Sequence, residues 1–434
     1  MGGMKPATDK MGVRFSRSQA MVVGLMLVFS VMSYFNRTIM SIAGPTIMGE
    51  FSLSETQMGT VFSAFLFSYT ILMIPGGKLA DRFGPKKVLA WMAFGSGLFT
   101  AMTALGGHPE LAGLAGVIPS FVVLRLAMGV ATAPLYPATG KMNAEWMAPE
   151  QRGRAQGVVN AGAGLGGAVA PVLFHWMILS FGWRMSFVMA GAATVGAGLL
   201  WMAFIRDRPA ERQATPAARS QGTPWRALFT NRNLLYLTLG YFMVCYFEYI
   251  FFYWIYYYLG KIRGLGEEQS AVYTTALFLT WFVMMPMGGW ASDRAVARWG
   301  SRRGMRIVGI SGLALAAVLL WAAVNTSGTA SAVALMSLAL GFAACSDVVF
   351  WAAVMEIAGR DVGAACGILN TGGNVGGFIA PMLTPWIATF AGWSGGLYFG
   401  SAMAMLGALT WLGFNPASPR AGHAGVQGGE TAAG

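Results

Sequence analysis

The chain has 434 residues, of which 56% are hydrophobic and only 11% are charged, and its formal net charge is +12. Soluble domains carry about 25% charged residues, so this composition excludes an ordinary soluble protein and indicates an integral membrane protein. A membrane-spanning helix needs ~20 apolar residues. By this criterion the sequence predicts an all-α protein with twelve spans, at residues 20–43, 57–80, 86–106, 116–141, 154–180, 185–205, 233–259, 269–292, 304–325, 330–356, 362–388 and 393–414.

The basic residues are distributed unevenly between the two sides of these spans. The polar lead at residues 1–19 enters the first span without the cleavage pattern of a signal peptide. If this lead is cytoplasmic, 24 of the 29 Lys and Arg face the cytoplasm and three lie on the other side. This positive-inside pattern predicts that both termini are cytoplasmic and that the protein lies in the cell (inner) membrane. The positive charge therefore needs no nucleic-acid partner.

The first span contains a cation, Arg37, well inside its apolar run. A bare charge at that depth costs at least ~2.5–3.5 kcal/mol and usually marks a pathway or a binding site. Tyr34 lies three positions before Arg37, so the two share a helix face, and Asn36 is the adjacent residue. Because a guanidinium pairs bidentately with a carboxylate, we expect this group to bind an acidic solute.

A polar segment divides the chain into two halves that resemble each other. Residues 157–171 match residues 367–381 at an offset of 210, and Gly182-Trp183 matches Gly392-Trp393 at the same offset. Parallel repeats of this kind are a known transporter architecture, with the solute site between the halves. The sequence thus predicts two pseudo-symmetric six-helix bundles. The expected limits are a lead at 1–19, bundles at 20–205 and 233–414, a cytoplasmic linker at 206–232 and a disordered tail at 415–434.

Several short motifs resemble those of the major facilitator superfamily. They are residues 76–87 (GGKLADRFGPKK) after the second span and Arg125–Gly129 in the fourth. Other stretches are similar to the anion:cation symporter family, which carries sugar acids and other organic anions: residues 34–37 (YFNR), 133–137 (APLYP) and 181–184 (FGWR). The resemblance implies transport by alternating access coupled to protons, and a solute site that includes Tyr69, Trp351, Asn370 and Asn374, with Asn160 as the repeat partner of Asn370.

The first of these motifs also has a physical interpretation. Asp81 follows the cytoplasmic end of the second span, and the eleventh span begins on the same face. The positive end of that helix dipole attracts a carboxylate, so Asp81 could latch the halves together, with Gly77 allowing close contact. Arg82 belongs to the same motif, although the basic residues here also fit simple membrane anchoring.

The chain departs from the symporter pattern at two acidic positions. The family commonly has acids where this sequence has Asn36 and Thr132, and neither an amide nor a hydroxyl titrates near neutral pH. Two other acids lie within spans, Glu248 and Asp347, and burial disfavours the charged form of a carboxyl group. We hypothesise that one of them carries the coupling proton. The alternatives are a neutralising ion pair with an arginine, Arg37 or Arg125, or a protonated carboxyl group that acts as a hydrogen-bond donor. For Arg125 itself a structural or coupling role is expected.

The resulting prediction is a secondary active transporter of small organic anions, with a sugar acid favoured and with proton coupling. An exchanger, a uniporter and a non-catalytic membrane receptor are the alternatives. The sequence has no phosphate-loop motif and no Cys/His spacing typical of a metal site. We therefore expect no enzyme activity, no catalytic residues, no cofactor and no metal. The expected partners are the anion, a proton or another coupling ion, and the lipid bilayer, and we expect a monomer.

Overall fold

The computed structural model describes residues 15–147, 149–205, 230–358 and 362–415. Every regular element in these ranges is a helix, which confirms the all-α prediction. The elements are α1 (Arg17–Phe51), α2 (Glu55–Phe83), α3 (Pro85–Met102), η1 (Thr103–Leu105), α4 (Pro109–Ala115), α5 (Val117–Thr132), α6 (Leu135–Trp146), α7 (Pro149–Phe204), α9 (Arg232–Tyr257), η3 (Tyr258–Ile262), α10 (Gly266–Asn325), α11 (Thr329–Ala358) and α12 (Val362–Thr410).

Three of these helices are too long to be single membrane spans. α7 has 56 residues, or ~84 Å at 1.5 Å per residue, whereas the hydrocarbon core of a bilayer is ~30 Å thick. Each is interrupted by one glycine with a positive φ of 68–75°: Gly182 in α7, Gly300 in α10 and Gly392 in α12. Glycine alone adopts this conformation readily. Within the described ranges nine helices are long and apolar enough to cross a membrane, and the count of twelve spans remains a prediction.

The helix boundaries differ from the sequence expectation in three places. The fourth predicted span is divided at Ala133 and Pro134 into α5 and α6, because proline has no N–H to continue the hydrogen-bond ladder. The short helix α4 forms in a segment expected to be a loop. The polar connection expected at residues 293–303 is helical up to Gly300, where the chain turns back.

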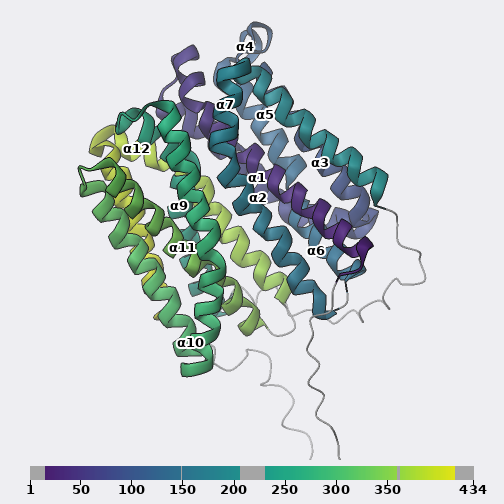
Figure 1. Cartoon of the computed structure of the whole chain (residues 1–434), viewed down its shortest axis with the longest axis vertical. Coiled ribbons are helices and arrows are strands. Elements are labelled where there is room, and N and C mark those ends of the chain that lie inside the picture. The colour runs from purple at the N-terminus through teal and green to yellow at the C-terminus, as the bar shows by residue number, and fades with distance from the viewer. Residues whose placement is uncertain (1–14, 148, 206–229, 359–361, 416–434) are drawn as a thin grey trace, which may run out of the picture.

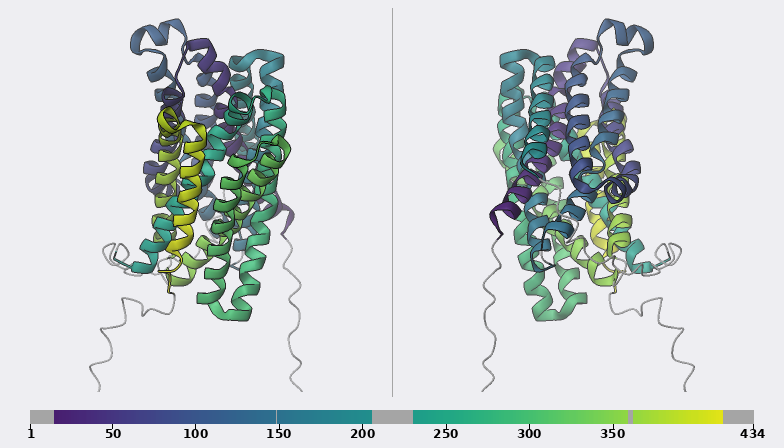
Figure 2. Two further views of the ribbon diagram at one scale, coloured as in Figure 1. Left: turned by 90° about the vertical axis from the view of Figure 1, so that its left-hand side faces the viewer. Right: turned by 90° about the vertical axis from the view of Figure 1, so that its right-hand side faces the viewer.

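The helices form two side-by-side groups. Figure 1 shows α1–α7 on the right and α9–α12 on the left, and the two views of Figure 2 face the α9–α12 side and the α1–α7 side in turn. Contacts between the groups join α2 to α12, α7 to α10 and α1 to α9. The domain limits remain predictions. Residues 206–229 of the expected linker lie outside the described residues, as do residues 1–14 of the lead and 416–434 of the tail.

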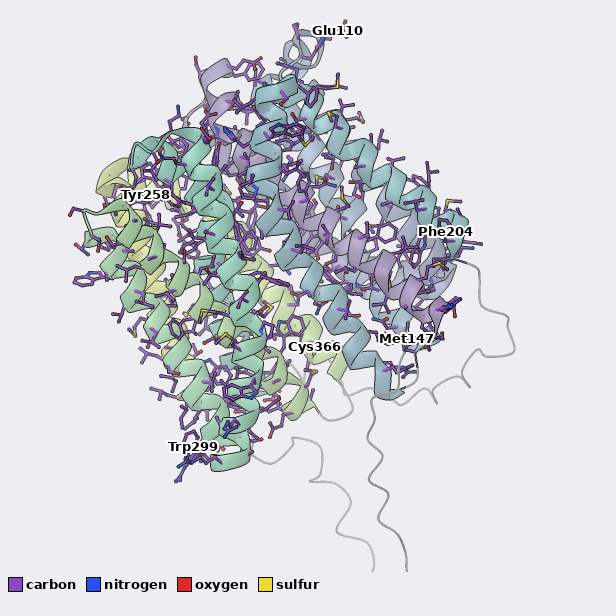
Figure 3. All side chains as sticks on the ribbon, in the orientation of Figure 1. Glu110, Met147, Phe204, Tyr258, Trp299 and Cys366 are labelled. Atoms are coloured by element: carbon purple, nitrogen blue, oxygen red, sulfur yellow. The ribbon has the colours of Figure 1, made fainter. Side chains whose placement is uncertain are left out.

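The molecule has two distinct ends, named here after residues labelled in Figure 3. Glu110 marks one end, and Trp299 marks the other. At the Glu110 end the two groups are in direct contact: Glu55 at the start of α2 accepts hydrogen bonds from the Tyr257 hydroxyl of α9 and from Trp393 Nε1 of α12. Further along α2, the Ser63 hydroxyl donates to the Phe378 carbonyl of α12 (2.8 Å). The two groups are therefore bridged along this half of α2.

Candidate functional site

Arg37 lies in α1, and its side chain is buried between the two helix groups. Only 2% of the residue is exposed. Its Nη1 donates a hydrogen bond of 2.7 Å to the hydroxyl of Tyr249, which belongs to α9 on the opposite side. The guanidinium also lies over three aromatic rings of its own group, at 4.6 Å from the Tyr34 centroid and 5.0 Å from those of Phe65 and Tyr69. The structure thus brings the predicted residues Tyr34, Arg37 and Tyr69 together.

This guanidinium has no acidic partner in the part of the chain that the structure describes. The ion pairs there are Lys141–Asp81 and Arg184–Glu50, and Arg37 Nε has no hydrogen-bond partner. Each ring face stabilises a desolvated cation by about 2 kcal/mol, which offsets part of the cost of burial but leaves the charge without a counter-ion. A planar fork of donors in such surroundings is suited to a bidentate carboxylate or another oxyanion.

Arg125 is also completely buried, and it contacts the backbone of Arg37. Its Nη1 contacts the sulfur of Met128 at 3.2 Å, and its Nη2 lies 3.5 Å from the carbonyl oxygen of Arg37. Its guanidinium lies 5.3 Å from the Phe65 centroid, so both cations contact the same ring. Arg125 therefore links α5 to the backbone of α1 at the point where Arg37 is positioned. Its predicted structural or coupling role remains a prediction.

Two of the predicted amides reach across from the other group toward Tyr69. Asn370 and Asn374 lie one turn apart on α12, and Asn374 Nδ2 donates to Asn370 Oδ1 at 3.2 Å. Both amide nitrogens approach the sulfur of Met73, at 3.4 and 3.7 Å. Met73 is one helical turn after Tyr69 on α2, so these amides contact the helix that carries Tyr69.

The other three predicted solute contacts are not joined to Arg37 by any described contact. Asn36 points toward α7, where its Nδ2 donates to the Thr194 hydroxyl at 2.8 Å. Asn160 is exposed and accepts from Gln156 on the same helix. Trp351 donates to the Tyr241 hydroxyl at 3.0 Å, within the second group. Their roles in binding remain predictions.

The predicted latch residues lie toward the Trp299 end. Asp81 forms a 2.9 Å ion pair with Lys141 of α6, and its side chain is 74% exposed. Gly77 faces Pro137, also of α6, and Arg82 lies over the ring of Phe83. All of these contacts are within the first group of helices, whereas the predicted latch requires a contact with α12. The latch therefore remains a prediction.

The two buried acids lie in the second group. Glu248 of α9 is 5% exposed and accepts a 3.1 Å hydrogen bond from Trp281 Nε1 of α10. Asp347 of α11 is 8% exposed, and its Oδ1 is buried without a partner. The two carboxyl groups interact electrostatically with each other. Among the described residues neither forms an ion pair, so the alternative of a fixed pair with an arginine is not observed.

Sequence reasoning missed Tyr249, the direct hydrogen-bond partner of Arg37. A signal was present in the sequence, because Tyr241, Cys245, Tyr249 and Tyr253 recur every four residues and therefore share one face of α9. All four are buried. Met73, which lies between Tyr69 and the amides, was also missed, and no sequence pattern distinguishes it from the other methionines.

Comparison with known proteins agrees with this architecture. A sequence model described as the Major Facilitator Superfamily matches residues 26–361 and 294–433. A probable sulfoacetate transporter of Cupriavidus necator is 32% identical over 92% of this chain and 94% of its own length. The hexuronate transporter of Bacillus subtilis is 29% identical over 92% and 95%, and a D-galactonate transporter of Escherichia coli is 26% identical over 91% and 95%.

Solved structures show the same fold at low sequence identity. A bacterial homologue of the human lysosomal transporter Spinster superposes with a TM-score of 0.77 at 16% identity, over 93% of this chain and 98% of that one. A D-xylose–proton symporter superposes with a TM-score of 0.70 at 17% identity, over 92% and 98%. On the sequence match, the shared fold and the buried site between its two helix groups, this chain belongs to the Major Facilitator Superfamily.

Proposed function

We propose that this protein transports small organic anions across the cell membrane by alternating access, and that Arg37 binds the acidic group of the solute. One observation carries the proposal: the Arg37 guanidinium is buried between the two groups of helices and has no acidic partner among the described residues. A buried cation of this kind is an unneutralised charge that an incoming anion can satisfy.

The relatives indicate the class of anion. Sulfoacetate, hexuronates and D-galactonate, for which these relatives are named, all carry an acidic group on a small polar body. The phenols of Tyr34 and Tyr69 next to Arg37, and the amides of Asn370 and Asn374 that contact Met73 one turn further along α2, supply donors and acceptors suited to hydroxyl groups. This combination favours a sugar acid as the solute.

The contact between Arg37 and Tyr249 suggests how binding is connected to movement. It joins α1 to α9, and therefore one group of helices to the other, through a single charge-assisted hydrogen bond. An anion that binds the guanidinium competes with Tyr249 for it, and therefore weakens a contact that joins the two groups of helices.

On the positive-inside pattern, we place the protein in the inner membrane with both termini in the cytoplasm, and we expect it to act as a monomer.

An exchanger or a uniporter is the second candidate. The two positions at which the symporter family commonly has acids are neutral here and are occupied by internal hydrogen bonds: Asn36 donates to Thr194, and Thr132 donates to the Met128 carbonyl. A transporter without titrating groups at those positions needs either another proton site or no coupling at all.

Binding to purified protein tests the role of Arg37. Thermal-shift measurements with D-glucuronate, D-galactonate and sulfoacetate identify a ligand, and titration calorimetry then compares the variants. Hydrogen bonds to charged groups contribute ~1.5–3 kcal/mol, so Arg37→Ala is expected to weaken binding by about tenfold or more. Arg303→Ala, which removes an exposed cation far from the site, is the matched control and should bind as the wild type does.

Two results would contradict the proposal. Unchanged affinity in a monodisperse Arg37→Ala protein would place the anion site elsewhere. Binding without any uptake or exchange in proteoliposomes would instead favour a receptor.

A further inference from the structure

The second group of helices contains a pair of buried acids without a counter-ion. Glu248 and Asp347 come from α9 and α11, are 5% and 8% exposed, and interact electrostatically. In the described part of the chain no lysine, arginine or histidine forms an ion pair with either of them. Burial and a neighbouring like charge each disfavour the ionised form of a carboxyl group, so the state with both acids ionised is the costly one.

The hydrogen bonds around the pair are unequal. Trp281 Nε1 donates to Glu248 Oε1, which stabilises the ionised form of Glu248. Asp347 Oδ1, in contrast, is a buried acceptor without a donor, and such an atom costs about 1–3 kcal/mol. Tyr241 donates a hydrogen bond to the Asp347 carboxyl, so only Oδ1 of that group lacks a partner. A proton on either acid removes the repulsion between the two.

The surroundings favour a proton over a metal ion. A bound Ca²⁺ takes six to eight oxygen ligands, and even Mg²⁺ requires an octahedral set. α9 and α11 contain no proline and are continuous around the acids, so their backbone carbonyls are engaged in helical hydrogen bonds. The side chain that hydrogen-bonds to Glu248, Trp281, is a donor and cannot ligate a cation. Within the described residues no group of three or more His, Cys, Asp or Glu is placed to hold a metal.

We propose that Glu248 and Asp347 together form a proton-binding site in the second half of the protein, and that this site couples proton movement to anion transport. The inference rests on the proposed transport function. It places the titrating groups in the second group of helices, whereas Arg37 and the neutral positions Asn36 and Thr132 lie in the first.

The charged and titratable groups that face the pair are few. Glu248 and Asp347 interact electrostatically with Tyr241 and Cys245 on α9 and with Tyr34 on α1. The cation in this neighbourhood is Arg37, which acts on Tyr34 and Cys245. Tyrosine and cysteine are neutral at physiological pH in their ordinary range, so the charge balance here is set by the two acids, Arg37 and the bound anion.

α9 connects the two sites mechanically. Glu248 and Tyr249 are adjacent residues on this helix, and they point to different partners: Glu248 to Trp281 on α10, and Tyr249 to Arg37 on α1. An anion that draws Arg37 away from Tyr249 frees the side of α9 next to Glu248. Both events therefore act on α9: the anion removes the hydrogen bond between Tyr249 and Arg37, and loss or gain of the proton changes the charge of the acid pair to which Glu248 belongs.

A first experiment detects the proton directly and does not depend on knowing the transported anion. Infrared difference spectra of the full-length purified protein between pH 5 and pH 9 report the carbonyl band of a buried protonated carboxyl group. We expect such a band in the wild type and its loss in Asp347→Asn and in Glu248→Gln. Glu356→Gln, an exposed acid on the same helix as Asp347, is the control and should keep the band. A band that persists in both variants, or that never appears, overturns the proton site.

A second experiment tests coupling in proteoliposomes with radiolabelled D-glucuronate and sulfoacetate as probes. The double variant Glu248→Gln, Asp347→Asn is expected to keep counterflow exchange. The accumulation that a pH gradient drives should fall by about tenfold or more. Accumulation equal to that of the wild type, or accumulation driven by a sodium gradient instead, overturns the proposed coupling. If wild-type protein transports neither probe, the proposed function fails for these anions, whereas the infrared result still decides whether the pair binds a proton.

Discussion

Among individual residues, the contact that bears most directly on anion binding is the hydrogen bond between Arg37 and Tyr249. It is short, it is buried, and it joins side chains that are 212 positions apart in the chain. This phenol is the hydrogen-bond partner of Arg37 Nη1, while Nε has none. A carboxylate can satisfy both nitrogens at once, so the phenol and the anion are competitors for the same donor.

This competition leads to a prediction for Tyr249→Phe. Without the phenol, the unliganded protein leaves one more buried donor unsatisfied, at a cost of about 1–3 kcal/mol, and the anion recovers that cost on binding. We expect a lower melting temperature without ligand, and tighter binding by roughly fivefold or more, measured by thermal unfolding and calorimetry.

Tyr253→Phe provides the matched control, because the Tyr253 hydroxyl on the same face of α9 is buried without a hydrogen-bond partner. This variant should be at least as stable as the wild type, with unchanged affinity. Weaker binding in Tyr249→Phe would show that the phenol contacts the anion and does not compete with it.

At the scale of elements, the close approach of α2 to α12 depends on Gly59. A Cβ atom added at Gly59 would lie 2.2 Å from the carbonyl oxygen of Pro381 and 3.3 Å from Pro385. This point lies between the Glu55 contacts and the Ser63–Phe378 hydrogen bond, so α2 touches the second group along its whole first half. A backbone atom cannot move aside as a flexible side chain can, so even a methyl group must separate the helices.

We therefore predict that Gly59→Ala favours conformations that are open at the Glu110 end. Spin labels at Ser180 and Ser327, both exposed, would report the distance between the two groups in a cysteine-free background. The distance distribution should shift to longer values, and transport should slow because closure is hindered.

The control is Gly196→Ala, at a position where an added Cβ has no heavy atom within 4 Å. This variant should leave the distances unchanged. An identical distribution in Gly59→Ala would mean that the contact with α12 does not limit closure.

The two ends of the whole molecule are held differently. At the Glu110 end, two tryptophans related by the 210-residue repeat each donate to an acid at the α1–α2 connection: Trp183 to Glu50 at 2.7 Å, and Trp393 to Glu55 at 3.2 Å. The first contact stays within one group and the second crosses to the other. Toward the Trp299 end, in contrast, Asp81 is exposed and paired within its own group. The structure therefore has its groups bridged at the Glu110 end, and the latch at the other end stays a prediction.

The latch predicts a population shift in Asp81→Asn. If the Asp81 carboxylate stabilises closure at the Trp299 end through the dipole of α12, removing its charge should lower the fraction of molecules closed there. Electron-spin distance measurements between labels at the exposed positions Met202 and Arg302 would report this fraction. Dipole contacts are worth about 0.3–1 kcal/mol, which corresponds to a two- to fivefold change in the ratio of states. Unchanged populations would exclude the latch.

Much of the fold could be predicted from the sequence because a bilayer imposes simple rules. Apolar runs of about 20 residues indicated the helices, and Gly182 and Gly392 fell where the chain turns. Arg37 could be found as a site candidate because a charge inside such a run is exceptional. These inferences use only composition and local spacing, and these properties are present in the sequence before any helix packs against another.

The contacts of the site were decided by tertiary structure. Asn36 is adjacent to Arg37 in sequence, yet it faces Thr194, because consecutive residues on a helix point about 100° apart. Tyr249 reaches Arg37 only through the rotation and depth of α9 relative to α1. The sequence by itself determined that this chain is a helical membrane protein with a buried cation. Packing between helices decided which side chains surround that cation, because a contact between distant segments depends on rotations and shifts that local spacing does not specify.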